Sequence, residues 1–162
     1  MFRALTAIAA VLVVALAAVS CSGDAAGPDD SALELRTAPV TVDVQGRSLS
    51  LEAHLWRDFM PVAPPDGQPL AAVLRVHASG GSPPAGLEAM AVWILHQDQI
   101  WMSEALDVMP PDSPAPPYYE AVARGGPKWG PDVRVDVIVR LRDAIGRTYL
   151  LRAPDQLIQR TD

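Results

Sequence analysis

The chain has few of the residues that form crosslinks or supply common reactive groups. Among its 162 residues there are one cysteine, Cys21, one lysine, Lys128, and three histidines. A single cysteine cannot form a disulfide within the chain, so we expect the hydrophobic core alone to hold the fold together. It also leaves no second thiol for nucleophilic chemistry.

Positive charge is scarce as well. The chain has 13 basic and 19 acidic residues, which gives a formal net charge of −6. Arg3 is the only charged residue among the first 20, so the rest of the chain carries −7. Nucleic acids and anionic lipid headgroups bind basic surfaces. We therefore expect neither of them as a partner.

Motifs of known enzymes are missing. The serines of the segment Ser79-Gly80-Gly81-Ser82 stand in a turn and not in a G-x-S-x-G nucleophile elbow. No glycine-rich loop joins a strand to a helix, and no D-x-D-x-D calcium loop is present. The sequence therefore predicts no catalytic residue, no bound metal and no cofactor. The one exception that we expect is a covalent lipid, which the N-terminal residues indicate.

One long apolar run is present, at the N-terminus. It covers residues 4–19, is interrupted only by Thr6, follows Arg3, and ends at the segment Val19-Ser20-Cys21. This order resembles the signal peptide of bacterial lipoproteins: a charged start, an apolar stretch, and small residues before a cysteine. An uncut transmembrane helix would need about 20 apolar residues. An ordinary secretory signal, with Cys21 incidental, remains the other alternative.

The resemblance implies a location. Residues 1–20 would be a signal peptide, Cys21 would carry fatty acyl chains such as palmitate, and residues 21–32 would be a flexible tether. Several acyl chains hold a protein on a membrane stably, because each buried methylene contributes about 0.8 kcal/mol. We therefore expect a cell-envelope protein anchored to a membrane by lipid and facing the periplasm or the cell exterior.

Apolar and polar residues alternate through the rest of the chain, which is typical of half-buried strands. The clearest case has an apolar face that consists of Val133, Val135, Val137, Val139 and Leu141. The same pattern predicts strands at residues 40–44, 49–55, 72–76, 91–96, 100–106 and 147–152. With 16 prolines, a helical bundle is excluded. We predict an all-β domain at residues 33–162: an antiparallel, immunoglobulin-like β-sandwich of about seven strands.

Two long segments without a strand pattern, residues 57–69 and 107–131, are the candidate binding loops. The second carries Tyr118, Tyr119 and Trp129, and tyrosine and tryptophan are frequent in binding hot spots. The alternative is that such aromatic side chains close the ends of the core. Residues 118–123 are expected to form a short turn of helix.

Counting connections in an antiparallel fold predicts which loops meet. The segment 107–131 should share one end of the domain with residues 45–47 and 79–86. The segment 57–69 should share the other end with the turns at 97–99 and 143–146.

These observations favour a lipid-anchored binding or structural module without enzymatic activity, with another envelope protein as its partner. The alternative is a metal- or small-ligand-binding lipoprotein. Its metal ligands would be His54 and His77, which lie on outward faces of their strands. A third hypothesis is an enzyme, and it requires a pocket that gathers polar groups such as Arg57, Asp58 and His96.

Overall fold

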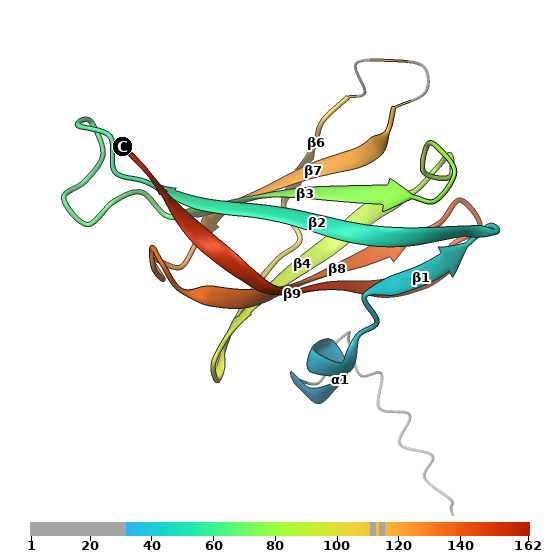
Figure 1. Ribbon diagram of the computed structural model, residues 1–162, viewed down its shortest axis with the longest axis horizontal. Helices are drawn as coiled ribbons and strands as arrows, with labels where there is room; N and C mark the ends of the chain where they lie inside the picture. The colour runs from blue at the N-terminus through green and yellow to red at the C-terminus, as the bar shows by residue number, and fades with distance from the viewer. Residues whose placement is uncertain (1–31, 111–112, 114–115) are drawn as a thin grey trace, which may run out of the picture.

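The computed structural model describes residues 32–110, 113 and 116–162, and this part of the chain is all-β (Figure 1). The predicted signal peptide, Cys21 and tether residues 21–31 lie outside it. No helix in the described ranges is long and apolar enough to cross a membrane. The elements are α1 (Ala32–Thr37), β1 (Thr41–Val44), β2 (Arg47–Asp58), β3 (Leu70–Ala78), β4 (Glu88–His96), β5 (Gln99–Ser103), β6 (Leu106–Val108), β7 (Tyr118–Gly126), β8 (Arg134–Arg142) and β9 (Thr148–Thr161).

The strands form one nearly closed sheet that resembles a flattened barrel. Their order is β5-β4-β8-β9-β2-β3-β7-β6, and β1 pairs with β2. Strand β9 makes one corner, because it pairs antiparallel with β8 and then, through residues 158–161, parallel with β2. The opposite corner lies between β5 and β6, which are separated only by Glu104 and Ala105. β5 pairs with β4 and β6 with β7, so the chain passes from one side of the barrel to the other.

The predicted hairpins are confirmed. β1 and β2 are joined by Gln45 and Gly46, whose φ angles are 51° and 76°. Positive φ at both central residues is typical of the tight turns that match strand twist, and glycine adopts it without strain. The β4–β5 and β8–β9 hairpins form as the alternation predicted.

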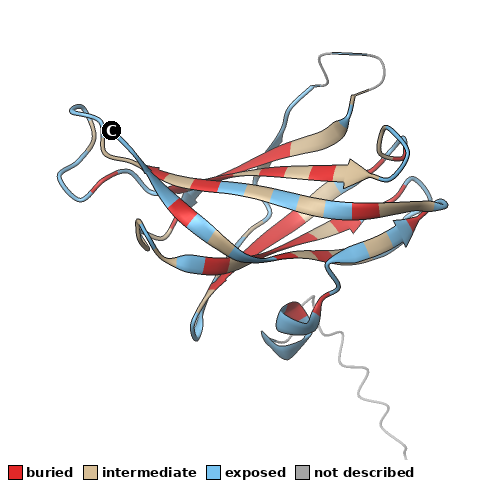
Figure 2. Cartoon of the chain, viewed as in Figure 1, coloured by how far each residue is buried: buried red, intermediate tan, exposed pale blue. Residues whose placement is uncertain are grey.

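Inward-facing residues of β2, β3, β4, β8 and β9 fill the barrel, as the buried positions in Figure 2 show. On β8, Val135, Val137, Val139 and Leu141 are buried as predicted. Ile138 faces outward by alternation but is also buried, because α1 covers it. Leu35 of α1 lies in this second apolar cluster, whose other members are Ala38, Ala91, Trp93, Leu95 and Ile138.

The prediction of a helix at residues 118–123 is wrong. These residues begin β7, which lies between β3 and β6. Alanine has a high helix propensity, but pairing with a strand on each side overrides that preference. The predicted loop 107–131 therefore contains a strand that runs the length of the barrel.

The missed strand also makes one loop placement wrong. Successive connections in an antiparallel fold lie at opposite ends. A prediction that overlooks one strand therefore assigns the later turns to the wrong end. The turn at 143–146 meets the 79–87 connection, since a Cβ on Gly86 would lie 2.9 Å from the Cβ of Ala144. It was predicted at the other end. The grouping of residues 45–47, 79–86 and the start of β7 is confirmed, because all of them line one pocket.

Candidate functional site

The connections lie at two ends of the barrel, which differ in how they are filled. We call the end with the connections 59–69, 97–98 and 127–133 the tied end. We call the end with the connections 45–46, 79–87, 143–147 and the described residues between β6 and β7 the hollow end. The two are on opposite sides in Figure 1.

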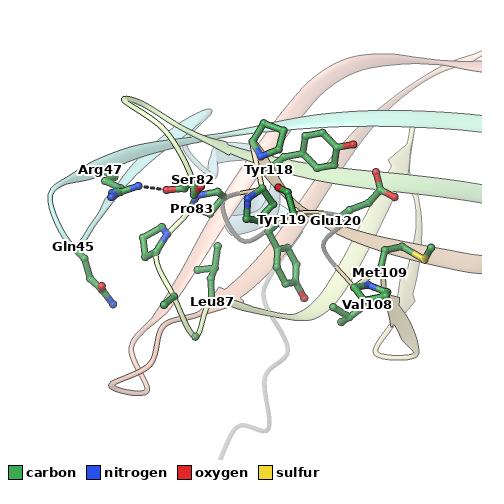
Figure 3. Close-up of a pocket in the computed structure, with 17 residues that line it drawn as sticks. Gln45, Arg47, Ser82, Pro83, Leu87, Val108, Met109, Tyr118, Tyr119 and Glu120 are labelled. Carbon is green, nitrogen blue, oxygen red and sulfur yellow. Dashed lines mark hydrogen bonds between the residues drawn. The ribbon is translucent and has the colours of Figure 1, made fainter.

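A pocket of about 940 Å³, which we call the loop-end hollow, opens at the hollow end (Figure 3). Its walls come from the β1–β2 turn, the β3–β4 connection, and the residues on either side of the β6–β7 connection. Five of the lining residues are proline and two are tyrosine. Proline has no backbone N–H, so these five positions offer a ligand no backbone hydrogen-bond donor.

Tyr119 and Leu87 form the floor of the hollow. Both belong to the barrel: Leu87 is buried in the main core, and Tyr119 packs against that core from β7. The hydroxyl oxygen of Tyr119 accepts a hydrogen bond from the backbone N–H of Ala89, with an N–O distance of 3.1 Å. Burial raises the pKa of Tyr119. The floor is therefore a fixed aromatic surface.

Apolar side chains at the rim of the hollow are exposed. Val108 and Met109, at the end of β6, are 54% and 46% exposed. Figure 3 shows these two residues on one side of the hollow and Pro83 on the other. An exposed apolar rim around a pocket is typical of a binding surface.

Two charged residues line the hollow, and they differ in their partners. The carboxylate of Glu120 pairs with the guanidinium of Arg75 at an N–O distance of 2.6 Å, and this hydrogen bond raises the pKa of Arg75. The guanidinium of Arg47 donates to the carbonyl oxygen of Ser82. Within the described ranges, no carboxylate pairs with Arg47. The hollow therefore has one cation whose charge is not neutralised by a described acid.

The structure divides the three predicted binding residues. Tyr119 faces the hollow. Tyr118 borders it, but its ring packs edge-on against His77 with 5.6 Å between centroids, and Arg75 lies over it at 4.8 Å. Trp129 lies at the tied end, beyond β7, where it packs against the main core and 5.5 Å from the ring of His96.

The tied end is organised by Arg57, which is only 3% exposed. Its guanidinium donates hydrogen bonds to the carbonyl oxygens of Gln68 and Lys128, with N–O distances of 3.0 and 3.1 Å. It also donates to Gly130 at 2.7 Å and to Asp66. One side chain therefore connects the 59–69 and 127–133 loops.

The residues of the alternative hypotheses lie apart. His54 and His77 share the outer face of β2 and β3, but His77 is paired with Ser50, four residues from His54. That offset is about 13 Å along the strand. His77 instead contacts Glu52, and His54 packs against Trp56. No group of three possible metal ligands occurs among the residues that the structure describes.

The three polar residues of the enzyme hypothesis lie at the tied end, and each of them already has another contact. Arg57 points inward and is occupied by loop carbonyls. Asp58, next to it on the strand, accepts a hydrogen bond from the backbone N–H of Met60 at 2.8 Å. His96 packs against Trp129.

Comparison with known protein families, curated proteins and solved structures gives no match. The site therefore rests on its own geometry. Sequence reasoning missed Arg47, Leu87 and Met109, which come from three segments far apart in the chain. The weak signal that pointed to them was the grouping of proline-rich connections at one end.

Proposed function

We propose that this chain is a lipid-anchored binding module of the cell envelope, and that the loop-end hollow is its binding surface. The observation that carries the proposal is the hollow itself, with a rim of exposed apolar residues at one end of the barrel. Its partner in this proposal is a component of the envelope, with a protein as the first candidate.

We further propose that the domain is immunoglobulin-like. Immunoglobulin constant-type domains place strands A, B, E and D in one sheet and C, F and G in the other. The order β2-β3-β7-β6 corresponds to A-B-E-D, and β4-β8-β9 corresponds to C-F-G. β5 beside β4 then corresponds to the additional strand C′ of variable-type domains. The conserved disulfide of antibody domains has no counterpart, because the only cysteine is Cys21.

This correspondence supports the choice of end. The β3–β4 and β8–β9 connections would be the B–C and F–G loops, which contact the antigen in variable domains. Both lie at the hollow end. Likeness of fold does not by itself assign a function. It adds weight here because the same end has the pocket and the exposed rim.

Lipid attachment at Cys21 rests on the signal-like N-terminus. Its test is mass spectrometry of the native protein. We expect a mature chain that begins at Cys21 and carries acyl mass, and we expect Cys21→Ser to release the protein from the membrane. A mature chain that begins elsewhere or lacks acyl mass would contradict the anchor.

The binding surface is tested by photo-crosslinking in the native cells. A photoreactive residue replaces Met109 at the hollow end or, as the matched control, Val62 at the tied end, where the side chain is 91% exposed. We expect a discrete adduct from position 109 and none from position 62. Equal labelling from both positions, or none from either, would contradict a protein-binding role for the hollow end.

Small-ligand binding is the second candidate function. The observation that favours it is the size of the hollow, about 940 Å³, which falls in the range of about 300–1,000 Å³ common for ligand pockets. A metal is not part of this candidate, because the two histidines that would have bound it are separated by the strand register.

A further inference from the structure

We propose that the loop-end hollow takes an apolar molecule with a single anionic headgroup, a carboxylate or a phosphate monoester, and that Arg47 binds this headgroup. The inference rests on the proposed binding role of the hollow and deepens its small-ligand form. It follows from three features of the lining: the walls, the charges and the geometry of Arg47.

The walls favour a hydrocarbon over a peptide. A bound peptide backbone needs donors and acceptors along its length, because unpaired amide groups are costly to bury. Five lining residues are prolines, which donate no hydrogen bond. The N–H of Ala89, beside the floor, is already used by Tyr119. Leu87, Tyr119 and Met109 instead offer apolar contact.

The charges favour an anion. Glu120, the acidic residue of the lining, is neutralised by Arg75 at 2.6 Å. Arg47 has no carboxylate partner in the described part of the chain and remains the residual charge of the pocket. The chain as a whole has a net charge of −6, so a cation at an apolar pocket contrasts with the net charge of the chain.

The geometry places the headgroup at the rim. Arg47 begins β2 directly after the tight turn at Gln45 and Gly46. One N–H of its guanidinium donates to the carbonyl oxygen of Ser82, which fixes the side chain beside the β3–β4 connection (Figure 3). A guanidinium has five N–H donors and pairs well with carboxylate or phosphate oxygens. The tail would then extend over Leu87 and Tyr119.

The test compares dodecanoic acid, dodecyl phosphate and uncharged methyl dodecanoate by calorimetric titration below their micelle concentrations. The protein is the full chain carrying Cys21→Ser, so that no covalent acyl chain competes. We expect at least one of the two anions to bind about tenfold or more tightly than the ester. Which anion binds more tightly decides between a carboxylate and a phosphate headgroup.

Three variants in the same background locate the contacts. Arg47→Gln should reduce the affinity for the anion about tenfold and leave that for the ester unchanged. Arg147→Gln, at the same end but outside the hollow, should change neither. Met109→Gln should weaken the anion and the ester alike, because it alters only the apolar wall.

The outcomes separate this inference from the proposed function. Equal affinity for anion and ester, with Met109→Gln weakening both, overturns the anionic headgroup and leaves the hollow as a binding site. Anion binding that Arg47→Gln does not weaken also overturns the inference. No binding of any probe overturns the inference and small-ligand binding together, while the crosslinking at position 109 tests protein binding separately.

Discussion

At the tied end, one buried arginine donates hydrogen bonds to two loops, whereas at the hollow end a half-buried arginine makes one such bond beside a pocket. Arg57 reaches four backbone carbonyl oxygens. Arg47 reaches the carbonyl oxygen of Ser82. The same residue type thus fixes loops at one end and leaves donors open at the other.

The difference separates stability from binding. Loops tied by buried hydrogen bonds contribute to the free energy of unfolding, and they leave few groups for a ligand. Loops with exposed apolar residues around a hollow contribute less to stability and offer more to a ligand, because these residues are not covered by the rest of the protein. Substitutions at the two ends should therefore separate into stability and binding effects.

Arg57→Ala should have the largest effect on stability. It would leave the carbonyl oxygens of two loops without their charged donor in a site that is 3% exposed. We expect a loss of about 3 kcal/mol or more in the free energy of unfolding, as for a broken buried hydrogen-bond network. The measurement is urea unfolding at neutral pH.

The matched control is Arg160→Ala at the same end. Arg160 also lies over the ring of Phe59, at 4.1 Å, but its side chain is 48% exposed. We expect only a small change. A loss for Arg57→Ala as small as that for Arg160→Ala would show that the buried arginine does not hold the tied end together.

A pair of glycines tests how tightly each end is packed. Gly67, at the tied end, and Gly86, at the hollow end, have φ angles of 76° and 73°. An added Cβ would lie 2.6 Å from the ring of Phe59 at position 67 and 2.9 Å from the Cβ of Ala144 at position 86. Positive φ costs a non-glycine residue about 1–2 kcal/mol, and overpacking adds about 1–3 kcal/mol.

We expect Gly67→Ala to be more destabilising than Gly86→Ala, by about 1 kcal/mol, because the added Cβ meets three atoms of the Phe59 ring at 2.6–3.0 Å, whereas at position 86 only one atom lies that close. Arg57 and Arg160 both contact this ring and oppose its displacement. Gly46→Ala isolates the backbone cost, since its φ is 76° and nothing lies within 4 Å of the added Cβ. Thermal unfolding of the three variants gives the order. If Gly86→Ala is the most destabilising, the hollow end is the more tightly packed of the two.

The hairpins could be predicted because one face of each strand is apolar. In β8 the buried valines alternate with charged residues at every position but Ile138, so the sequence itself marks the inward side. Strand β7 could not be found this way. Ala121, Val122 and Ala123 are all buried in succession, so no alternation marks the strand. Pairing with β3 and β6 defines β7, and such pairing is not visible in local sequence.

The end at which each connection lies is predicted by counting strands, so one missed strand changes the prediction for connections far along the chain. It moved the 143–146 turn to the wrong end and placed Trp129 beside the tyrosines. The hollow was predictable only as a grouping of loops. The positions of Arg47, Leu87 and Met109 around one space depend on how the β1–β2, β3–β4 and β6–β7 connections pack, which no single segment encodes.

Acid sensitivity should depend more on the hollow end, through Asp143. Burial alone would raise the pKa of Asp143, but hydrogen bonds from the backbone N–H groups of Arg147 and Ile145 and from the hydroxyl of Tyr149 outweigh it and lower the pKa. The stability that this carboxylate contributes is therefore present above its unfolded pKa of about 4 and lost as the pH falls through the lowered folded value.

Asp143→Asn should be less stable than the parent at pH 7, and its stability should fall less steeply on acidification. Urea midpoints at about pH 7 and about pH 3 measure both effects. Asp98→Asn, in the exposed β4–β5 turn at the tied end, is the control and should follow the parent. Parallel pH profiles for Asp143→Asn and the parent would show that the turn carboxylate does not stabilise the fold.

The smallest effect is expected from Asp66 at the tied end. Its hydrogen bond with Lys128, at an N–O distance of 2.7 Å, lowers the pKa of Asp66, so its contribution also lies above the unfolded pKa and is lost as the pH falls. The two side chains are 69% and 39% exposed, however, and surface pairs of this kind stabilise little.

Asp66→Asn keeps the backbone carbonyl oxygen that accepts a hydrogen bond from Arg57, so only the ion pair with Lys128 is removed. We expect Asp66→Asn to shift the urea midpoint less than Asp143→Asn does. The shift from Asp66→Asn should disappear in about 1 M NaCl, where the screening length is about 3 Å. A shift that persists in salt would show that this pair, rather than Arg57 alone, joins the two loops.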